Sequence, residues 1–68
     1  MTLRPYSEPT QRELEVLVAY CRFEGQKGAA EHLGIAKSTV RNHLENVRTR
    51  LGVKTTAAAV YLLRDRLA

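Results

Sequence analysis

Between Lys37 and Leu51 the chain alternates apolar residues with side chains that carry amine, guanidinium, hydroxyl and amide groups. The apolar residues are spaced by four, three and four positions, as on one face of an α-helix, and they are Val40, Leu44, Val47 and Leu51. The polar residues fall on the opposite face: Lys37, Ser38, Arg41, Asn42, Glu45, Arg48 and Thr49. Because such groups bind phosphates and the edges of bases, the pattern predicts a helix over 37–51 that offers one face to a nucleic acid.

Two kinds of contact are expected from this polar face. Contacts with base edges in the major groove are predicted for Lys37, Ser38, Arg41, Asn42 and Glu45. The Arg41 guanidinium can bridge two acceptors of guanine, and the Asn42 amide can pair with adenine. For Glu45 a salt bridge with Arg41 or Arg48 is the favoured role, and acceptance of a hydrogen bond from cytosine is the alternative.

Contacts with phosphates position a protein on DNA without reading the base sequence. They are predicted for Lys27, Thr39, His43, Arg48, Arg50 and Lys54. His43 also lies beside the apolar Leu44, so a packed and hydrogen-bonded histidine is an equal alternative there. Residues 37–68 hold seven basic and two acidic residues, whereas residues 1–36 hold four basic and five acidic ones. The positive charge is therefore concentrated in and after the predicted nucleic-acid-binding helix.

The elements before this helix must hold it in place. A first helix is predicted from about Gln11 to Phe23, because Thr10 and Glu13 have the spacing of a capping box and Gly25 is suited to end it. Its inward face is expected to hold Leu14, Leu17, Val18 and Cys21, with Val16, Tyr20 and Phe23 covering a flank.

A second, short helix is predicted over residues 26–33, with Ala29, Ala30 and Leu33 facing inward. Gly34 then allows the chain to reverse, and Ile35 gives the turn an apolar contact. A short helix, a tight turn and a helix with a polar face are typical of the helix-turn-helix motif.

A fourth helix is predicted over residues 56–67, with Thr55 as its N-cap. It carries more apolar side chains than one buried face needs in so small a domain. Two explanations are equally open: the whole helix packs onto the first one, or part of it forms a dimer interface through Val60, Leu63 and Leu67.

With 68 residues the chain is expected to form one domain over residues 10–68, after a flexible or loosely docked arm over residues 1–9. Cys21 is the only cysteine, which excludes an internal disulfide, fits a reducing cytoplasm and favours a small buried residue over a reactive thiol. The chain has no apolar run long enough for a membrane span, so a cytoplasmic location and no membrane partner are expected. It has no nucleophile–base pair, glycine-rich phosphate loop or metal cluster, so no enzyme activity, no cofactor and no metal are expected.

Two segments carry a resemblance to a known family: TQRELEVL over residues 10–17 and STVRNHLENVRTRLGV over residues 38–53. Together they resemble the LuxR/GerE-type helix-turn-helix domain of bacterial and phage regulators. The resemblance implies a compact all-α domain of four helices, whose helix 37–51 enters the major groove and whose last helix often serves dimerisation. It implies a sequence-specific transcription regulator, either as a stand-alone small protein or as an excised output domain. Its implied partners are double-stranded DNA, a second copy on that DNA and RNA polymerase.

The chain departs from the family pattern at a few positions. Gly28 and Ala29 stand where Glu and a large aliphatic residue are common, which predicts a weaker second helix. Ala36 stands where a serine usually caps the recognition helix. Two alternatives to a transcription regulator therefore stay open. One is a DNA-binding adaptor of phage or recombination machinery, similar to a terminase small subunit or to the promoter-reading region 4 of a sigma factor, and the other is a protein-interaction module.

Overall fold

The side chains of Thr10 and Glu13 start the first helix by capping each other's backbone. In the computed structural model, which describes residues 7–67, the Thr10 Oγ1 accepts a hydrogen bond from the Glu13 N–H at 3.1 Å, and the Glu13 Oε1 accepts one from the Thr10 N–H at 2.9 Å. This reciprocal pair confirms the predicted capping box. Helix α1 spans Gln11–Arg22, and Phe23 is its C-cap instead of its last residue.

The predicted bounds of the next two helices are confirmed. Helix α2 spans Gln26–Leu33 and helix α3 spans Lys37–Leu51. Between them Gly34 has a φ of 70°, a left-handed conformation that costs glycine little, and its N–H donates to the Ala30 carbonyl at 2.9 Å. The Ile35 N–H donates to the same carbonyl at 3.1 Å, and the Ile35 side chain packs against the core. This short turn places α3 directly after α2, as a helix-turn-helix motif requires.

The predicted fourth helix is divided in two. Thr55 is the N-cap, as predicted, because its Oγ1 accepts a hydrogen bond from the Ala58 N–H at 3.0 Å. Helix α4 spans only Thr56–Leu62, however, and helix α5 follows over Arg64–Leu67. The expectation of one continuous helix over 56–67 is therefore wrong, although the described part of the chain is all-α as predicted.

The break between α4 and α5 falls at Leu63, whose φ of −103° and ψ of 11° lie outside the helical region. The Leu63 side chain is buried in the core, and the next side chain, that of Arg64, donates to the Tyr61 carbonyl at 2.6 Å. The Arg64 guanidinium thus satisfies a carbonyl near the end of α4, which helps the chain to change direction there.

The core lies between α1, α2, α3 and α4. Its largest fully buried side chains are Leu17, Leu44, Val16, Val40 and Val47. All four α3 residues that were predicted to face inward are buried. On α1 the buried face differs from the predicted one, because Val16 and Ala19 are buried, Val18 is half-buried and Cys21 is exposed. Helix α1 contacts both α2 and α3, so its buried arc is wider than a single apolar stripe. Cys21 lies in the last turn of α1 and is exposed, so the prediction that it is buried is wrong.

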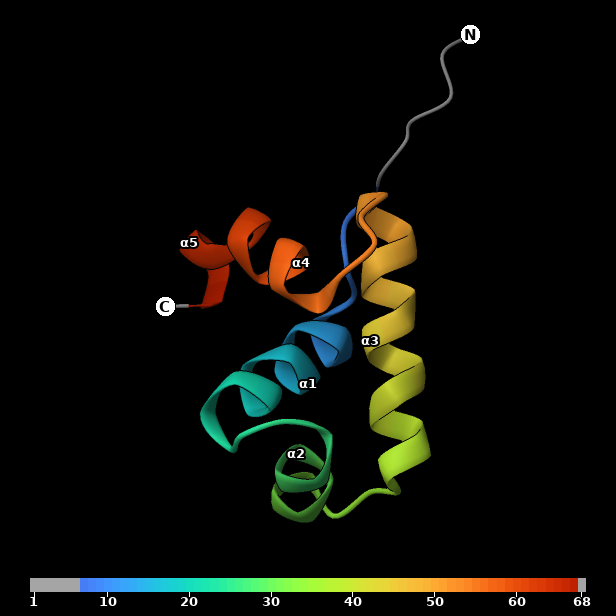
Figure 1. Ribbon diagram of the computed structural model, residues 1–68, viewed down its shortest axis with the longest axis vertical. Coiled ribbons are helices and arrows are strands. Elements are labelled where there is room, and N and C mark those ends of the chain that lie inside the picture. The colour runs from blue at the N-terminus through green and yellow to red at the C-terminus, as the bar shows by residue number, and fades with distance from the viewer. Residues whose placement is uncertain (1–6, 68) are drawn as a thin grey trace, which may run out of the picture.

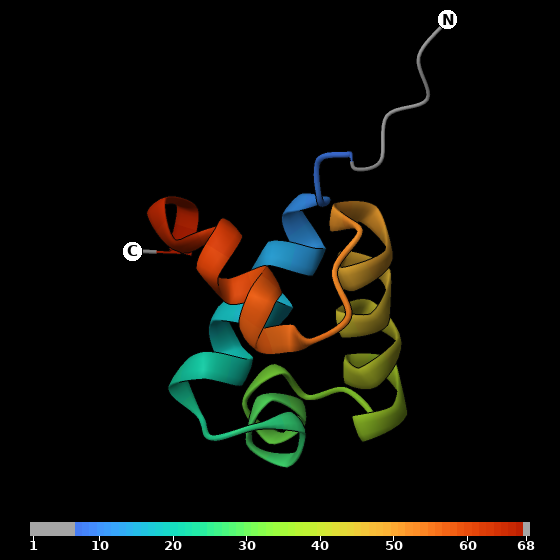
Figure 2. The same cartoon turned by 45° about the horizontal axis from the view of Figure 1, so that its top comes forward.

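Helix α3 runs along one side of the domain. In Figures 1 and 2 the other helices lie on the same side of α3, and its far side faces outward. The supporting contacts come from α1, α2 and α4, each of which touches α3. The fold therefore holds α3 from one side and leaves a continuous helical face uncovered by the rest of the described chain.

The last part of the predicted arm is docked on the domain. The Ser7 N–H donates to the Arg50 carbonyl at 2.7 Å, the Glu8 carboxylate pairs with the Arg66 guanidinium, and Pro9 is buried. Residues 7–9 are therefore ordered against α3 and α5. Residues 1–6 of the predicted arm lie outside the described residues.

Candidate nucleic-acid interface

The uncovered face of α3 carries every residue predicted to contact bases. Lys37, Ser38, Arg41, Asn42 and Glu45 are all exposed. Asn46 and Thr49 are exposed on the same helix, and neither was among the predicted base or phosphate contacts. The spacing of four between Asn42 and Asn46 is the signal that could have placed Asn46 on the outward face, because residues four apart share a helix face. The outward face of α3 therefore has the predicted length and includes Asn46 in addition to the predicted polar residues.

The residues predicted to contact phosphates are not grouped in one place. Thr39, His43 and Arg50 are half-buried along one edge of the outward face of α3, and Arg48 is half-buried along the other. Lys27 on α2 and Lys54 in the segment between α3 and α4 are exposed. A helix lying in the major groove has a sugar–phosphate backbone on each side, so cations at both edges of α3 and beyond its ends suit that geometry.

Arg50 is paired within the domain. Its Nε lies 2.9 Å from the Oε1 of Glu13, a carboxylate whose side chain is only 5% exposed. The N–H direction does not satisfy hydrogen-bond geometry, so the contact is an ion pair by distance alone. The same Glu13 oxygen accepts the Thr10 N–H of the capping box. Arg50 therefore offsets the charge of the buried Glu13 carboxylate. This ion pair joins the start of α1 to the end of α3.

Arg48 has a different kind of partner. Its Nη1 donates a hydrogen bond to the Oγ1 of Thr56, the first residue of α4, at 2.9 Å. Within residues 7–67 Glu45 forms no ion pair with Arg41 or Arg48. The favoured prediction for Glu45, a salt bridge along α3, is therefore wrong for the isolated chain, because the Arg48 guanidinium turns toward α4.

His43 combines features of its two predicted alternatives. It is half-buried, and its Nδ1 is shielded from solvent without a hydrogen-bond partner in the described part of the chain. The histidine is thus packed, as one alternative states, but it lacks the hydrogen bond that this alternative included. A contact between its other ring nitrogen and a phosphate remains a proposal.

The three residues predicted to form a dimer interface differ in exposure. Leu63 is only 5% exposed and belongs to the core, while Val60 and Leu67 are half-buried against it. The exposed apolar side chains of α4 are instead Tyr61, at 63%, and Leu62, at 53%. Leu63 therefore has little surface to offer a second copy, and Tyr61 and Leu62 have much more.

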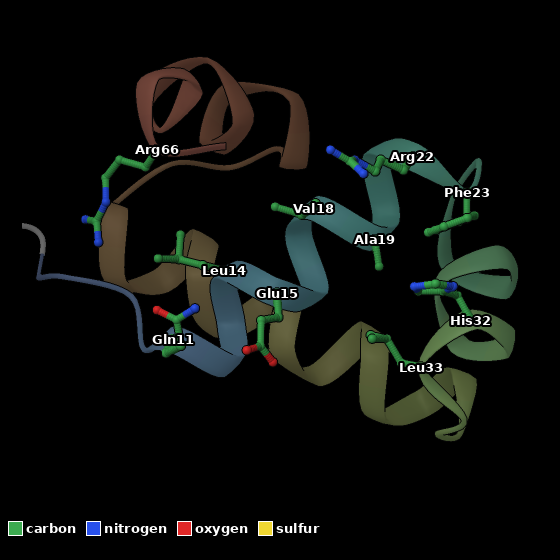
Figure 3. Close-up of a pocket in the computed structure, with 10 residues that line it drawn as sticks. All are labelled: Gln11, Leu14, Glu15, Val18, Ala19, Arg22, Phe23, His32, Leu33 and Arg66. Atoms are coloured by element: carbon green, nitrogen blue, oxygen red, sulfur yellow. The ribbon is translucent and has the colours of Figure 1, made fainter. Parts of the chain in front are cut away.

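A groove of about 630 Å³ lies on the outward side of α1. Figure 3 shows its lining, which comes from α1, α2, α5 and the C-cap Phe23, with Leu14, Val18 and Leu33 among the apolar members. At one end the rings of Phe23 and His32 are stacked, with centroids 4.0 Å apart. Because α1 separates this groove from α3, a nucleic acid bound along the outward face of α3 would leave the groove open.

The described residues also bear on metal binding, membrane spanning and thiol reactivity. Among residues 7–67 no group of three or more His, Cys, Asp or Glu side chains is arranged to hold a metal ion. In the same range no helix has the length and apolarity required to cross a membrane. The Cys21 thiol is exposed, yet partial burial raises its pKa, which lowers the fraction of reactive thiolate at neutral pH.

The fold and the outward face of α3 define a helix-turn-helix domain of the kind that binds DNA. Residues 9–63 match the family of bacterial regulatory proteins named for luxR, also called GerE. Since the match covers most of the chain, the chain belongs to this family. The resemblance inferred from the two sequence segments is thereby confirmed.

The chain is similar to parts of several longer regulators. It is 38% identical over 64 residues to the transcriptional regulatory protein LiaR of Bacillus subtilis, a match that covers 93% of this chain and 30% of LiaR. It is 41% identical over 56 residues to LnrK of the same organism, covering 81% of this chain and 26% of LnrK. It is 34% identical over 67 residues to the oxygen regulatory protein NreC of Staphylococcus aureus, covering 97% of this chain and 31% of NreC. The chain thus spans less than a third of each of these relatives, and no solved structure matches it significantly.

Proposed function

We propose that this domain binds double-stranded DNA in a sequence-specific manner and regulates transcription in the cytoplasm, with α3 inserted into the major groove. The observation that carries the proposal is the outward face of α3, where Lys37, Ser38, Arg41, Asn42 and Glu45 are exposed together. These side chains supply donors and acceptors that can distinguish base pairs from the major groove. The family membership supports regulation of transcription as the purpose of that binding.

We assign base recognition chiefly to Arg41 and Asn42, which are exposed in the N-terminal half of α3. Within residues 7–67 Arg41 makes no ion pair and no side-chain hydrogen bond, so its guanidinium is available to bridge the two acceptors of a guanine. Lys27, Thr39, His43, Arg48 and Lys54 are proposed phosphate contacts. The ion pair of Arg50 with Glu13 favours a structural role for that arginine.

The test is a comparison of wild-type chain and Arg41→Ala on a selected site and on random-sequence duplex. Loss of a bidentate contact with a base should cost about 1–3 kcal/mol on the selected site and little on random DNA. Asp65→Ala is a control for an exposed position on α5, outside the proposed DNA-binding face of α3. Equal losses on both DNAs would contradict a base-reading role for Arg41.

We further propose that two copies bind one DNA site through the exposed α4 residues Tyr61 and Leu62, with Val60 and Leu67 at the margin. An exposed tyrosine and leucine next to each other are suited to self-association, because pairing them removes apolar surface from water. Two-fold pairing of recognition helices would read an inverted repeat, as other dimeric helix-turn-helix proteins do.

The proposed contact with RNA polymerase has to lie outside the face of α3 that DNA would cover. The groove beside α1 meets this condition, and Glu15 lies on its rim with half of its side chain exposed. Transcription from a promoter that carries the selected site should fall for Glu15→Ala, while the affinity for that DNA stays unchanged. An unchanged transcription level would remove the groove as the polymerase contact.

A further inference from the structure

We propose that Thr56 is a positioning residue that holds Arg48 in place for a DNA phosphate, while Arg50 serves the fold. This inference rests on the proposed function of α3. It concerns two arginines that lie two positions apart near the end of the same helix and were expected to do the same work. Their partners in the structure separate their roles.

The hydrogen bond from the Arg48 Nη1 to the Thr56 Oγ1, at 2.9 Å, joins the last part of α3 to the first residue of α4. Both residues are half-buried. The neighbouring Thr55 uses its hydroxyl differently, since it caps α4 by accepting the Ala58 N–H. Thr56 is therefore free of the capping role, and its hydroxyl is directed at the arginine instead.

The charges of the two partners differ. Arg50 faces the buried carboxylate of Glu13, which offsets its positive charge within the domain. Thr56 is neutral, so Arg48 keeps its full charge while one of its five N–H donors is engaged. Within residues 7–67 Arg48 has no carboxylate partner. A guanidinium that is held by a neutral group retains donors and charge for a phosphate.

The position of Arg48 fits such a contact. Arg48 lies seven residues after Arg41 and eleven after Lys37, spacings that place the three side chains along one edge of the outward face of α3. The N-terminal residues of a recognition helix contact base edges, whereas residues near its C-terminal end, such as Arg48, lie closer to the phosphate backbone. The last cation of this row is thus Arg48, which is hydrogen-bonded to Thr56 of α4.

Fixing the arginine before DNA binds reduces the entropy that is lost on binding. A free arginine side chain has many rotamers, and immobilising it opposes association. With the hydrogen bond to Thr56 already formed, part of this ordering occurs during folding. Helix α4, through Thr56, therefore contributes to the affinity of α3 for DNA.

The experiment measures the affinity of the full chain for a random-sequence duplex over a range of salt concentrations by fluorescence anisotropy, because phosphate contacts do not depend on base sequence. Thr56→Val removes the hydroxyl with little change of shape, and we expect it to weaken binding about threefold to tenfold, which corresponds to a hydrogen bond of ordinary strength. Thr56→Ser keeps the hydroxyl and should bind like the wild type. Arg48→Gln should reduce the slope of log affinity against log salt by about 0.9, the value for one phosphate.

A double-mutant cycle separates positioning from a general structural effect. In the Arg48→Gln background, Thr56→Val should cause no further loss, because there is no arginine left to hold. Arg22→Gln removes the same charge from the rim of the groove beside α1 and should leave the salt slope unchanged. Equal losses from Thr56→Val in both backgrounds, or no loss in the wild-type background, would overturn the positioning role alone. Absence of duplex binding by the wild-type chain would overturn the proposed function and this inference together.

Discussion

The backbone of Phe23 occupies the space that a side chain at position 28 would need. A β-carbon built on Gly28 would lie 1.6 Å from the Phe23 carbonyl oxygen and 2.7 Å from its carbonyl carbon. Gly28 is inside α2, where glycine is normally unfavourable, and the sequence alone predicted that it weakens this helix. The structure shows a compensating reason for it: the first turn of α2 packs directly on the end of α1.

Gly28→Ala should therefore destabilise the domain, although the same change in most helices is stabilising by about 0.5–1 kcal/mol. The β-carbon would force the backbone at Phe23 away from α2, and overpacking of this kind costs about 1–3 kcal/mol. Urea unfolding followed by circular dichroism measures the difference. Glu31→Ala, an exposed change in the same helix, is the control and should alter stability by no more than about 0.5 kcal/mol. A stabilised Gly28→Ala would show that the two helices can separate without cost.

Arg50→Gln should lower the free energy of unfolding and leave the salt dependence of DNA binding nearly unchanged. The substitution removes the cation next to the buried Glu13 carboxylate, and an uncompensated group of this kind costs about 1–3 kcal/mol. DNA affinity is measured under conditions where the variant is fully folded. A reduced salt slope with unchanged stability would reverse the assignment, making Arg50 the phosphate contact.

Ala36→Ser should stabilise α3. Ala36 occupies the N-cap position, with an extended φ of −71° and ψ of 149°, and no side chain caps the helix there. A serine hydroxyl at an N-cap accepts one of the unpaired backbone N–H groups, a gain of about 0.5–2 kcal/mol relative to alanine. Ala57→Ser, an exposed change within α4, should instead be slightly destabilising. Thermal unfolding compares the two variants, and equal shifts in Tm would contradict the capping argument.

Leu62→Glu should weaken dimer formation on a two-fold symmetric DNA site without unfolding the domain, because Leu62 is mostly exposed. Leu63→Ala should behave differently, since truncation of a buried leucine costs about 2–5 kcal/mol in stability. Sedimentation velocity with and without DNA gives the oligomeric state, and urea unfolding gives the stability. A Leu62→Glu variant that assembles like the wild type would remove this part of α4 from the interface.

The parts of the fold that depend on local signals could be predicted from the sequence. The capping box of Thr10 and Glu13, the turn at Gly34 and the apolar spacing along α3 each act within a few residues, so the helix starts and the inward face of α3 were predicted correctly. The break at Leu63 was missed, because a run of helix-forming residues continues through it and no local signal in the sequence marks it.

The candidate site divides in the same way. The exposure of Arg41 and Asn42 follows from their position opposite the apolar stripe of α3, which the sequence contains. The separate partners of Arg48 and Arg50 could not be predicted, since Thr56 and Glu13 belong to other helices and only the packed fold brings them close. Helical spacing gives the direction of a side chain, whereas its partner depends on tertiary structure.

Selection of bound sequences from a pool of random duplex DNA, carried out in parallel with the wild-type chain and with Arg41→Ala, shows whether Arg41 on α3 recognises a base. If the outward face of α3 reads bases, the wild-type chain should enrich a defined motif that contains guanine, and the variant should lose preference at one base pair of each half-site. An identical motif from both proteins would show that Arg41 does not recognise a base, and no motif from the wild type would show that the domain does not read DNA sequence.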